Sequence, residues 1–222
     1  MASTSERGDR VDYVFGYATL VGLRERLRVG DVKLAPLPGR LRGFHRTWGV
    51  AMDNWDAVND PKHFVDRKTG GRPQVRVAYL DIYERQGSTV NGLALPVDAT
   101  RLVALDAREV NYERIDVSEA FEHVEDVSAG EREDADAPAG GAGGMRASPR
   151  RVFAYVGTEA ARERCRAGAA EGNVCVSADY VATVRRAFER FTPDALAEYE
   201  RSTNPLPFPE RDLQRVSRRV MH

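Results

Sequence analysis

Apolar residues alternate along the middle of the chain in a way that predicts one prominent strand. Over residues 74–84, apolar side chains fall on both faces, which is typical of a central strand covered on each side. Gly87 and Ser88 predict a turn after it, and the apolar run 90–95 predicts the antiparallel partner of a hairpin.

Four further segments are rich in aromatic and β-branched residues and predict the rest of a sheet. Residues 12–17, 110–117 and 151–156 each predict a strand. Residues 33–50 mix apolar side chains with prolines and glycines, which predicts short strands with bends in a curved sheet.

Helical spacing occurs once between the strands and then dominates the end of the chain. Asp98 predicts the N-cap of a helix over residues 99–108, and Ser177 the N-cap of a second helix. The second helix has an apolar face at a period of about 3.6 residues, formed by Tyr180, Val181, Val184, Phe188 and Phe191.

Two more helices are expected near the end of the chain. Pro193 predicts the first position of one, and residues 204–209 end it. Residues 212–219 predict a short basic helix on the surface. Strands with one helix among them, followed by helices, indicate an α+β fold around a curved or barrel-like sheet.

The domain organisation follows from changes in composition. Residues 1–10 are polar and predict a disordered leader, and residues 11–203 predict one domain. Residues 122–149, first acidic and then rich in glycine and alanine, bury too little apolar surface to offset the entropy of ordering. They predict a disordered insertion, and residues 204–222 predict a C-terminal extension.

Charge and cysteine content narrow the class of protein. Thirty-three basic against 34 acidic side chains give a net charge of -1, which offers no general attraction to nucleic acid or membranes. No apolar segment is long enough to span a bilayer or to act as a secretory signal. Cys165 and Cys175 are expected to be unpaired or buried thiols. A cytoplasmic location is predicted, and the oligomeric state is left open.

Several common catalytic motifs do not occur in the sequence. There is no Gly-x-Ser-x-Gly elbow, His-Glu-x-x-His pair or Walker phosphate loop. The four histidines lack the spacing of metal ligands, which argues against a zinc site. His45 is either a histidine of the sheet or a side chain lining a pocket.

Two short segments are candidates for chemistry. Where the first strand ends, Tyr17, Ala18, Thr19 and Leu20 can expose several backbone N–H groups, a feature that many strand ends share. Glu109 lies four and seven residues beyond Leu105 and Leu102, so it extends the apolar face of the helix. A carboxylate there is either a partly desolvated proton shuttle or one half of a scaffold salt bridge with an arginine.

Together these segments resemble the γ-glutamylcyclotransferase superfamily, which includes ChaC-like and BtrG-like proteins. Its members begin with a strand reading roughly Phe-x-Tyr-Gly-Ser-Leu, here residues 15–20, and later carry Leu-Asp-x-x-Glu, here residues 105–109. The likeness spans about residues 13–191 apart from the insertion. Each motif is loose, and their order and spacing make the resemblance specific.

The resemblance implies a small mixed β-barrel with flanking helices and an enzyme that needs no cofactor. Backbone N–H groups of Tyr17, Ala18, Thr19 and Leu20 would hold a γ-glutamyl group, and Glu109 would be the catalytic acid/base. The substrate's α-amino group would attack its own γ-carbonyl, releasing 5-oxoproline and an amine.

The sequence departs from the pattern of this family at one point. Ala18 and Thr19 replace the usual Gly-Ser, and an alanine forced to positive φ would cost about 1 kcal/mol. A non-catalytic small-molecule binding module is therefore the alternative, and an interaction protein that uses the insertion is a third. Tyr17, Tyr79 and Tyr112 either line the pocket or belong to the core.

Overall fold

The computed structural model describes residues 11–23, 27–29, 32–56, 62–124 and 149–217. The predicted leader and most of the predicted insertion lie outside these residues. The first half of the chain forms β1 (Val11–Gly16), the 3₁₀ turn η1 (Thr19–Gly22), β2 (Leu27–Val29), β3 (Val32–Leu34), β4 (Leu37–Asp53), β5 (Lys62–Asp66) and β6 (Arg76–Val97). The second half forms α1 (Ala99–Arg108), β7 (Tyr112–Asp116), β8 (Phe121–His123), β9 (Pro149–Gly157), α2 (Glu159–Ala170), β10 (Val174–Ser177), α3 (Ala178–Glu189), α4 (Ala195–Arg201), β11 (Glu210–Arg211) and β12 (Leu213–Ser217).

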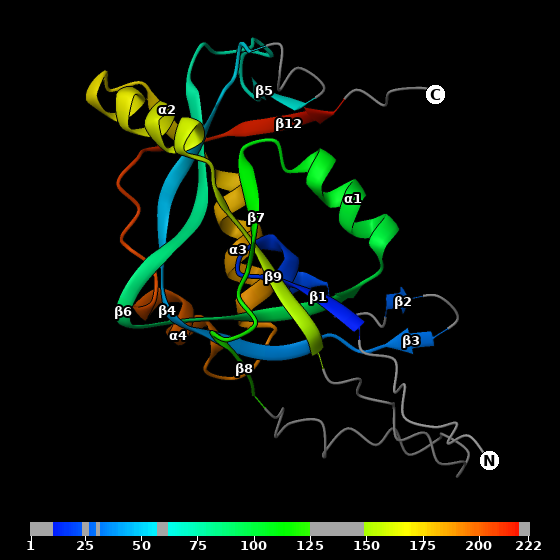
Figure 1. Cartoon of the computed structure of the whole chain (residues 1–222). Coiled ribbons are helices and arrows are strands. Elements are labelled where there is room, and N and C mark those ends of the chain that lie inside the picture. The colour runs from blue at the N-terminus through cyan, green and yellow to red at the C-terminus, as the bar shows by residue number, and fades with distance from the viewer. Residues whose placement is uncertain (1–10, 24–26, 30–31, 57–61, 125–148, 218–222) are drawn as a thin grey trace, which may run out of the picture.

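Two long antiparallel strands, β4 and β6, form the spine of the molecule (Figure 1). The predicted hairpin between residues 74–84 and 90–95 is wrong, because both segments belong to β6 and both pair with β4. Between the pairs Arg42–Thr89 and Phe44–Glu84, β4 has one intervening residue and β6 has four. Gly87, at φ 78°, therefore lies in a bulge of a continuous strand rather than in a hairpin turn.

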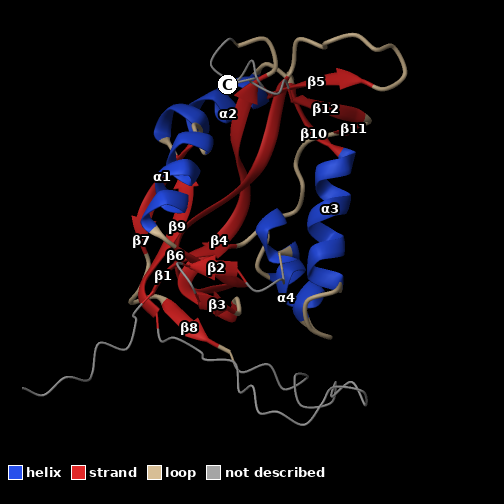
Figure 2. Cartoon of the chain, turned by 90° about the vertical axis from the view of Figure 1, so that its right-hand side faces the viewer, coloured by secondary structure: helices blue, strands red, loops and turns tan. Residues whose placement is uncertain are grey.

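Strands β1, β7, β9, β10 and β11 extend the sheet on either side of β6, whereas β2 with β3 and β5 with β12 form two separate two-stranded sheets. β1 pairs antiparallel with the end of β6 and parallel with β9, and β7 pairs antiparallel with β9. β10 lies parallel to the start of β6. Figure 2 shows α1 and α2 on one side of these strands and α3 and α4 on the other, which confirms the α+β class.

The sheet curves strongly, and its described strands are not joined into a ring by backbone pairing alone. β7 pairs with β9, and β8 pairs with β4, but no ladder links β7 to β8. The chain itself connects them through a tight turn in which the Ala120 N–H donates to the Val117 carbonyl. The sheet has the curvature expected from the sequence, but its described strands do not form a closed barrel.

The helix α1 has the predicted bounds and cap. The Asp98 side chain accepts a hydrogen bond from the Arg101 N–H at 2.7 Å, as an N-cap residue does. Ser177 precedes α3 as predicted, but its hydroxyl donates to the Leu213 carbonyl and caps no N–H of the helix. The prediction that Pro193 opens the next helix is wrong, since α4 begins at Ala195.

The end of the chain pairs with strands of the domain. The prediction of a helix over residues 212–219 is wrong. Residues 213–217 form β12, which pairs antiparallel with β5. Leu213 is fully buried there, and its partner strand contributes the buried Phe64. The burial of Leu213 and the pairing with β5 override the basic, helix-compatible composition of the segment.

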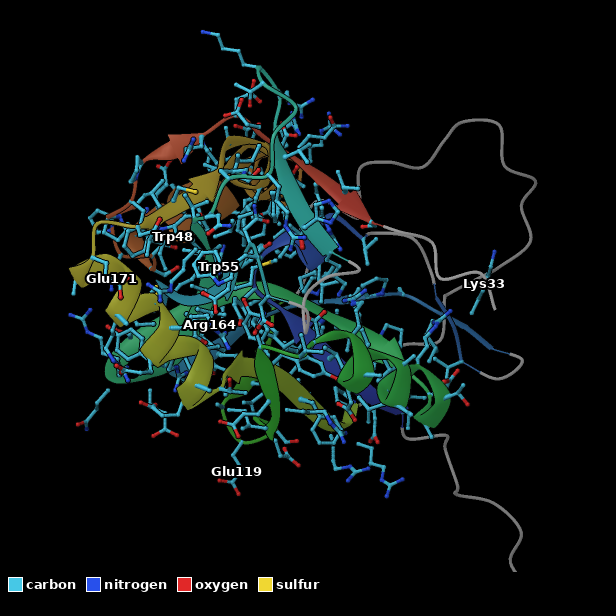
Figure 3. The ribbon with its side chains drawn as sticks, turned by 90° about the horizontal axis from the view of Figure 1, so that it is seen from above. Lys33, Trp48, Trp55, Glu119, Arg164 and Glu171 are labelled. Atoms are coloured by element: carbon cyan, nitrogen blue, oxygen red, sulfur yellow. The ribbon has the colours of Figure 1, made fainter. Side chains whose placement is uncertain are left out.

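The helix α2 was not predicted, because its buried side consists of small residues rather than large apolar ones. Ala161, Cys165 and Gly168 face the sheet. Ion pairs and hydrogen bonds help to attach it: Arg164, labelled in Figure 3, contacts Asp53 at 3.1 Å and the Ala51 carbonyl at 2.8 Å. The sequence therefore has no strong apolar stripe there to reveal a helix.

Both cysteines are buried free thiols, as predicted. Burial raises the pKa of each thiol to about 11, so both are protonated at neutral pH. No helix among the described residues has the length and apolar character that a membrane span requires.

Candidate active site

A cavity of about 320 Å³ opens where β1, α1 and the β5–β12 ribbon meet. Residues of β4, β6 and α3 also line it. Its walls are formed by Phe15, Gly16, Tyr17, Ala18, Thr19, Leu20, Met52, Lys62, Tyr79, Leu80, Leu105, Arg108, Glu109, Val110, Asn111, Tyr112, Tyr155, Tyr180 and Arg215.

The two sequence motifs meet at this cavity. Tyr17, Ala18, Thr19 and Leu20 line it from the end of β1, and Glu109 lines it from the end of α1. These segments are far apart in the sequence and are brought together by the sheet, in which β1 pairs with the end of β6 just before α1.

The first backbone N–H groups of the turn after β1 are not used by the hydrogen bonds of the turn itself. Its first hydrogen bond runs from the Val21 N–H to the Ala18 carbonyl at 3.1 Å, so the N–H groups of Thr19 and Leu20 precede the bonded turn. Ala18 has φ −138°, so the penalty expected for an alanine at positive φ does not arise.

Gly16 sets the path of this turn by its lack of a side chain. A Cβ atom at Gly16 would lie 2.4 Å from the Leu20 Cβ. We expect Gly16→Ala to displace the turn and to lower the free energy of unfolding by about 1–3 kcal/mol, the usual cost of overpacking.

Urea denaturation measures this loss, with Gly71→Ala as the matched control. A Cβ at Gly71 meets its nearest neighbour, the Thr69 hydroxyl, at 3.4 Å, an ordinary contact. Equal stability of the two variants would show that the turn accommodates a side chain at Gly16.

Glu109 is the C-cap residue that follows α1. Its N–H donates to the Leu105 carbonyl at 2.9 Å, and its side chain is 25% exposed. Arg108 holds the carboxylate by donating from Nε and Nη2 to Oε1, at 2.8 and 2.6 Å. The structural salt bridge with an arginine, which the sequence left open as the alternative role of Glu109, is thus present. It uses one oxygen and leaves Oε2 without a described hydrogen bond.

A chain of tyrosine hydrogen bonds links the two motifs. The Tyr17 hydroxyl donates to the Tyr155 carbonyl at 2.6 Å, and the Tyr155 hydroxyl donates to Asp106 Oδ1 at 2.7 Å. Asp106 belongs to the Leu-Asp-x-x-Glu segment and also contacts Arg114 at 3.1 Å. The loop residue and the helix that carries Glu109 are therefore positioned by the same strand, β9.

The tyrosines of the cavity are neutral hydroxyl groups. Burial raises the pKa of Tyr17 and Tyr112 well above the usual value, with the Asp81 charge and neighbouring phenols adding to it. Tyr112 donates to the Leu80 carbonyl at 2.9 Å. Both tyrosines, like Tyr79, line the cavity and are also part of the packed interior. The two roles that the sequence left open, pocket lining and core, therefore apply to the same side chains.

Several lining residues were not identified as site residues from the sequence, and four of them carry hydroxyl or cationic groups. Tyr155 and Tyr180 were predicted only as members of a strand and of a helix face. Lys62 and Arg215 come from β5 and β12, and no sequence signal indicated that these two strands pair beside the cavity. His45 lies elsewhere, buried in the sheet, where its Nε2 contacts Asn204 Oδ1 at 2.9 Å.

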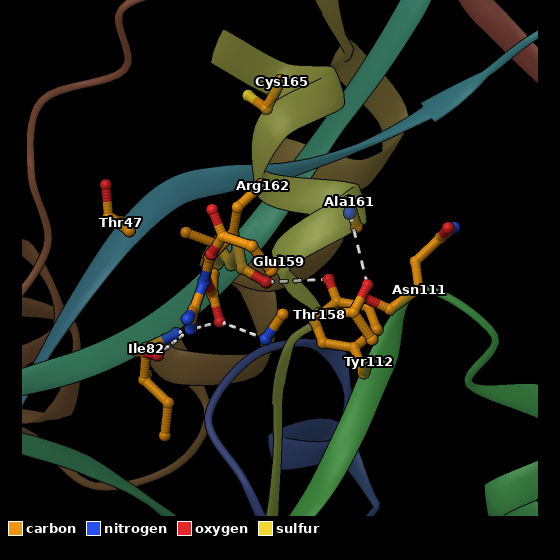
Figure 4. Close-up of polar contacts among 12 residues, drawn as sticks. Thr47, Ile82, Asn111, Tyr112, Thr158, Glu159, Ala161, Arg162 and Cys165 are labelled. Atoms are coloured by element: carbon orange, nitrogen blue, oxygen red, sulfur yellow. Dashed lines mark hydrogen bonds and ion pairs between the residues drawn. The ribbon is translucent and has the colours of Figure 1, made fainter.

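Behind the cavity, a buried carboxylate fixes the junction of β6, β9 and α2. Asp81 Oδ1 accepts hydrogen bonds from the N–H groups of Ile82 at 2.8 Å and Gly157 at 2.7 Å. Its Oδ2 accepts from Arg162 Nε at 2.8 Å. Figure 4 shows Arg162 beside Ile82, with Thr158 at the start of the same helix bonded to the Ala161 N–H.

Comparison with known structures gives similar folds. A gamma-glutamyl cyclotransferase matches over 90% of this chain and 91% of its own, at 12% identity and TM-score 0.43. A yeast gamma-glutamyl cyclotransferase specific to glutathione matches over 88% and 98%, at 14% identity and TM-score 0.44. YkqA from Bacillus subtilis matches over 91% of this chain but 57% of its own, at 14% identity and TM-score 0.47.

The agreement with the sequence resemblance concerns the fold. No protein-family model and no curated protein matches the chain. Since every TM-score quoted is below 0.5, the functional proposal depends on the cavity and on the two motifs that line it. Among the described residues, no group of three or more His, Cys, Asp or Glu side chains is arranged to hold a metal ion.

Proposed function

We propose that this protein is a cofactor-independent γ-glutamylcyclotransferase-like enzyme. It would convert a γ-glutamyl amine or peptide into 5-oxoproline and a free amine. The observation that carries the proposal is that Glu109 is the one carboxylate among the described residues lining the cavity, and that it shares this cavity with the Tyr17–Leu20 turn.

The reaction balances without water or a redox partner. The substrate's α-nitrogen forms a bond to its γ-carbonyl carbon, and the bond from that carbon to the amine nitrogen breaks. The α-nitrogen begins as an ammonium and ends as the lactam N–H, so it loses two protons. Glu109 accepts one of them and delivers it to the departing amine nitrogen, and the other passes to solvent or to the released amine as its ammonium proton. One carboxylate can serve both steps because the second proton transfer reverses the first.

The other groups of the cavity fit supporting roles. The N–H groups of Thr19 and Leu20 are candidates to stabilise negative charge on the γ-oxygen. The hydroxyls of Tyr17, Tyr112 and Tyr155 donate their protons to protein oxygens, so they would meet a substrate as neutral hydrogen-bond acceptors. Because ring closure is intramolecular, a cavity that holds the glutamyl chain folded provides much of the acceleration.

The direct test measures 5-oxoproline and free amine after incubation with γ-glutamyl dipeptides, glutathione and γ-glutamyl amines. We expect the two products in equal amounts from at least one substrate. If the folded protein releases neither product from any of them but is stabilised against heat by one, it is a non-catalytic binding module instead.

A further inference from the structure

Two cations from the β5–β12 ribbon reach the rim of the cavity. In the antiparallel register Arg215 lies opposite Phe64, and Ser217 lies opposite Lys62. Directly opposed residues and residues two apart share one face of such a ribbon, so Lys62, Phe64 and Arg215 point to the same side. Phe64 is buried against Tyr79 on that side, which turns the two cations toward the cavity.

The cavity has more positive than negative charge. Its charged lining residues are Lys62, Arg108, Arg215 and Glu109. Arg108 and Glu109 form an ion pair, and within the described part of the chain neither Lys62 nor Arg215 pairs with a carboxylate. Lys62 donates one hydrogen bond to the Arg108 carbonyl at 3.0 Å and has two further donors.

The positive charge of Arg215 acts on the ammonium group of Lys62. Burial lowers the pKa of Lys62, with Arg215 and Arg108 adding to the effect and Glu109 opposing it. An anion bound between Lys62 and Arg215 would relieve this repulsion. Arg215 is exposed and Lys62 half-buried, so the pair is accessible from solvent at the mouth of the cavity.

We propose that Lys62 and Arg215 bind a carboxylate on the amine half of the substrate. This inference depends on the proposed function. The glutamyl half has to reach Glu109 and the Tyr17–Leu20 turn, and the departing half has to leave through the mouth, where the two cations lie. The enzyme would therefore prefer γ-glutamyl amino acids with a free carboxylate over γ-glutamyl compounds whose amine half is uncharged.

A matched pair of substrates tests this preference. γ-Glutamyl-alanine and γ-glutamyl-alaninamide differ only in that a carboxylate replaces a carboxamide. Charge-assisted hydrogen bonds are roughly twice as strong as neutral ones, so we expect kcat/KM for the acid to exceed that for the amide by about 10- to 100-fold. Arg215→Met and Lys62→Met should each reduce this ratio several-fold.

The ratio is insensitive to the amount of folded enzyme, because a loss of folded protein lowers both values equally. Arg211→Met is the control, since Arg211 lies on the neighbouring strand β11 and does not line the cavity. Equal turnover of acid and amide, or a ratio that survives both cavity substitutions, would overturn the role of the pair and leave the cyclotransferase proposal standing. Absence of 5-oxoproline from every substrate would overturn both.

Discussion

Replacing Glu109 with glutamine is expected to reduce 5-oxoproline formation by about 10²- to 10⁴-fold, the usual contribution of a positioned general acid/base. Glutamine keeps the size of the side chain and can still accept a hydrogen bond from Arg108, but it cannot take the proton of the α-ammonium. The measurement is kcat/KM for the best substrate found with the native protein.

Stability distinguishes this role from that of a scaffold salt bridge. Arg108 and Glu109 keep 48% and 25% of their side-chain surface exposed, and such partly solvated pairs contribute about 0–1 kcal/mol. We therefore expect Glu109→Gln to unfold at nearly the same urea concentration as the native protein.

A matched control comes from the same stretch of chain. Glu113→Gln makes the same chemical change at an exposed position of β7 outside the cavity, and it should retain full activity. A Glu109→Gln protein with native kcat/KM would show that another group moves the proton, and the Arg108–Glu109 pair would then be structural only.

The sequence allowed prediction of the parts of the site that belong to regular, locally encoded elements. The helix α1 was predicted with its cap, because Asp98 and the spacing of Leu102 and Leu105 are local signals. From that helix the position of Glu109 followed directly. The turn after β1 was predicted because an apolar strand ends there in small and polar residues.

What could not be predicted depends on contacts between distant segments. The paired strands β5 and β12 are short and separated by about 150 residues of sequence, so nothing local indicates that Lys62 and Arg215 share one face. The continuity of β6 through Gly87 was missed for a similar reason. A glycine at positive φ suits a hairpin turn and a bulge equally well, and only the partner strand β4 decides between them.

Replacing Asp81 with asparagine is expected to lower the free energy of unfolding by about 2–4 kcal/mol. Removing one partner of a buried ion pair typically costs 3–5 kcal/mol, and the loss is smaller here because Arg162 keeps 28% of its side chain exposed. Asparagine can still accept from the Ile82 and Gly157 N–H groups through Oδ1. Its amide nitrogen, however, would face the Arg162 guanidinium with a donor instead of an acceptor.

The expected fall in Tm is roughly 4–16 °C for a chain of this size, measured by thermal unfolding followed by circular dichroism. Asp179→Asn is the matched control, since Asp179 also pairs with an arginine, Arg67, but is 60% exposed. That substitution should cost at most about 1 kcal/mol. Equal losses in the two variants would mean that burial gives the Asp81–Arg162 pair no special weight, and that the junction of β6, β9 and α2 is held by apolar packing instead.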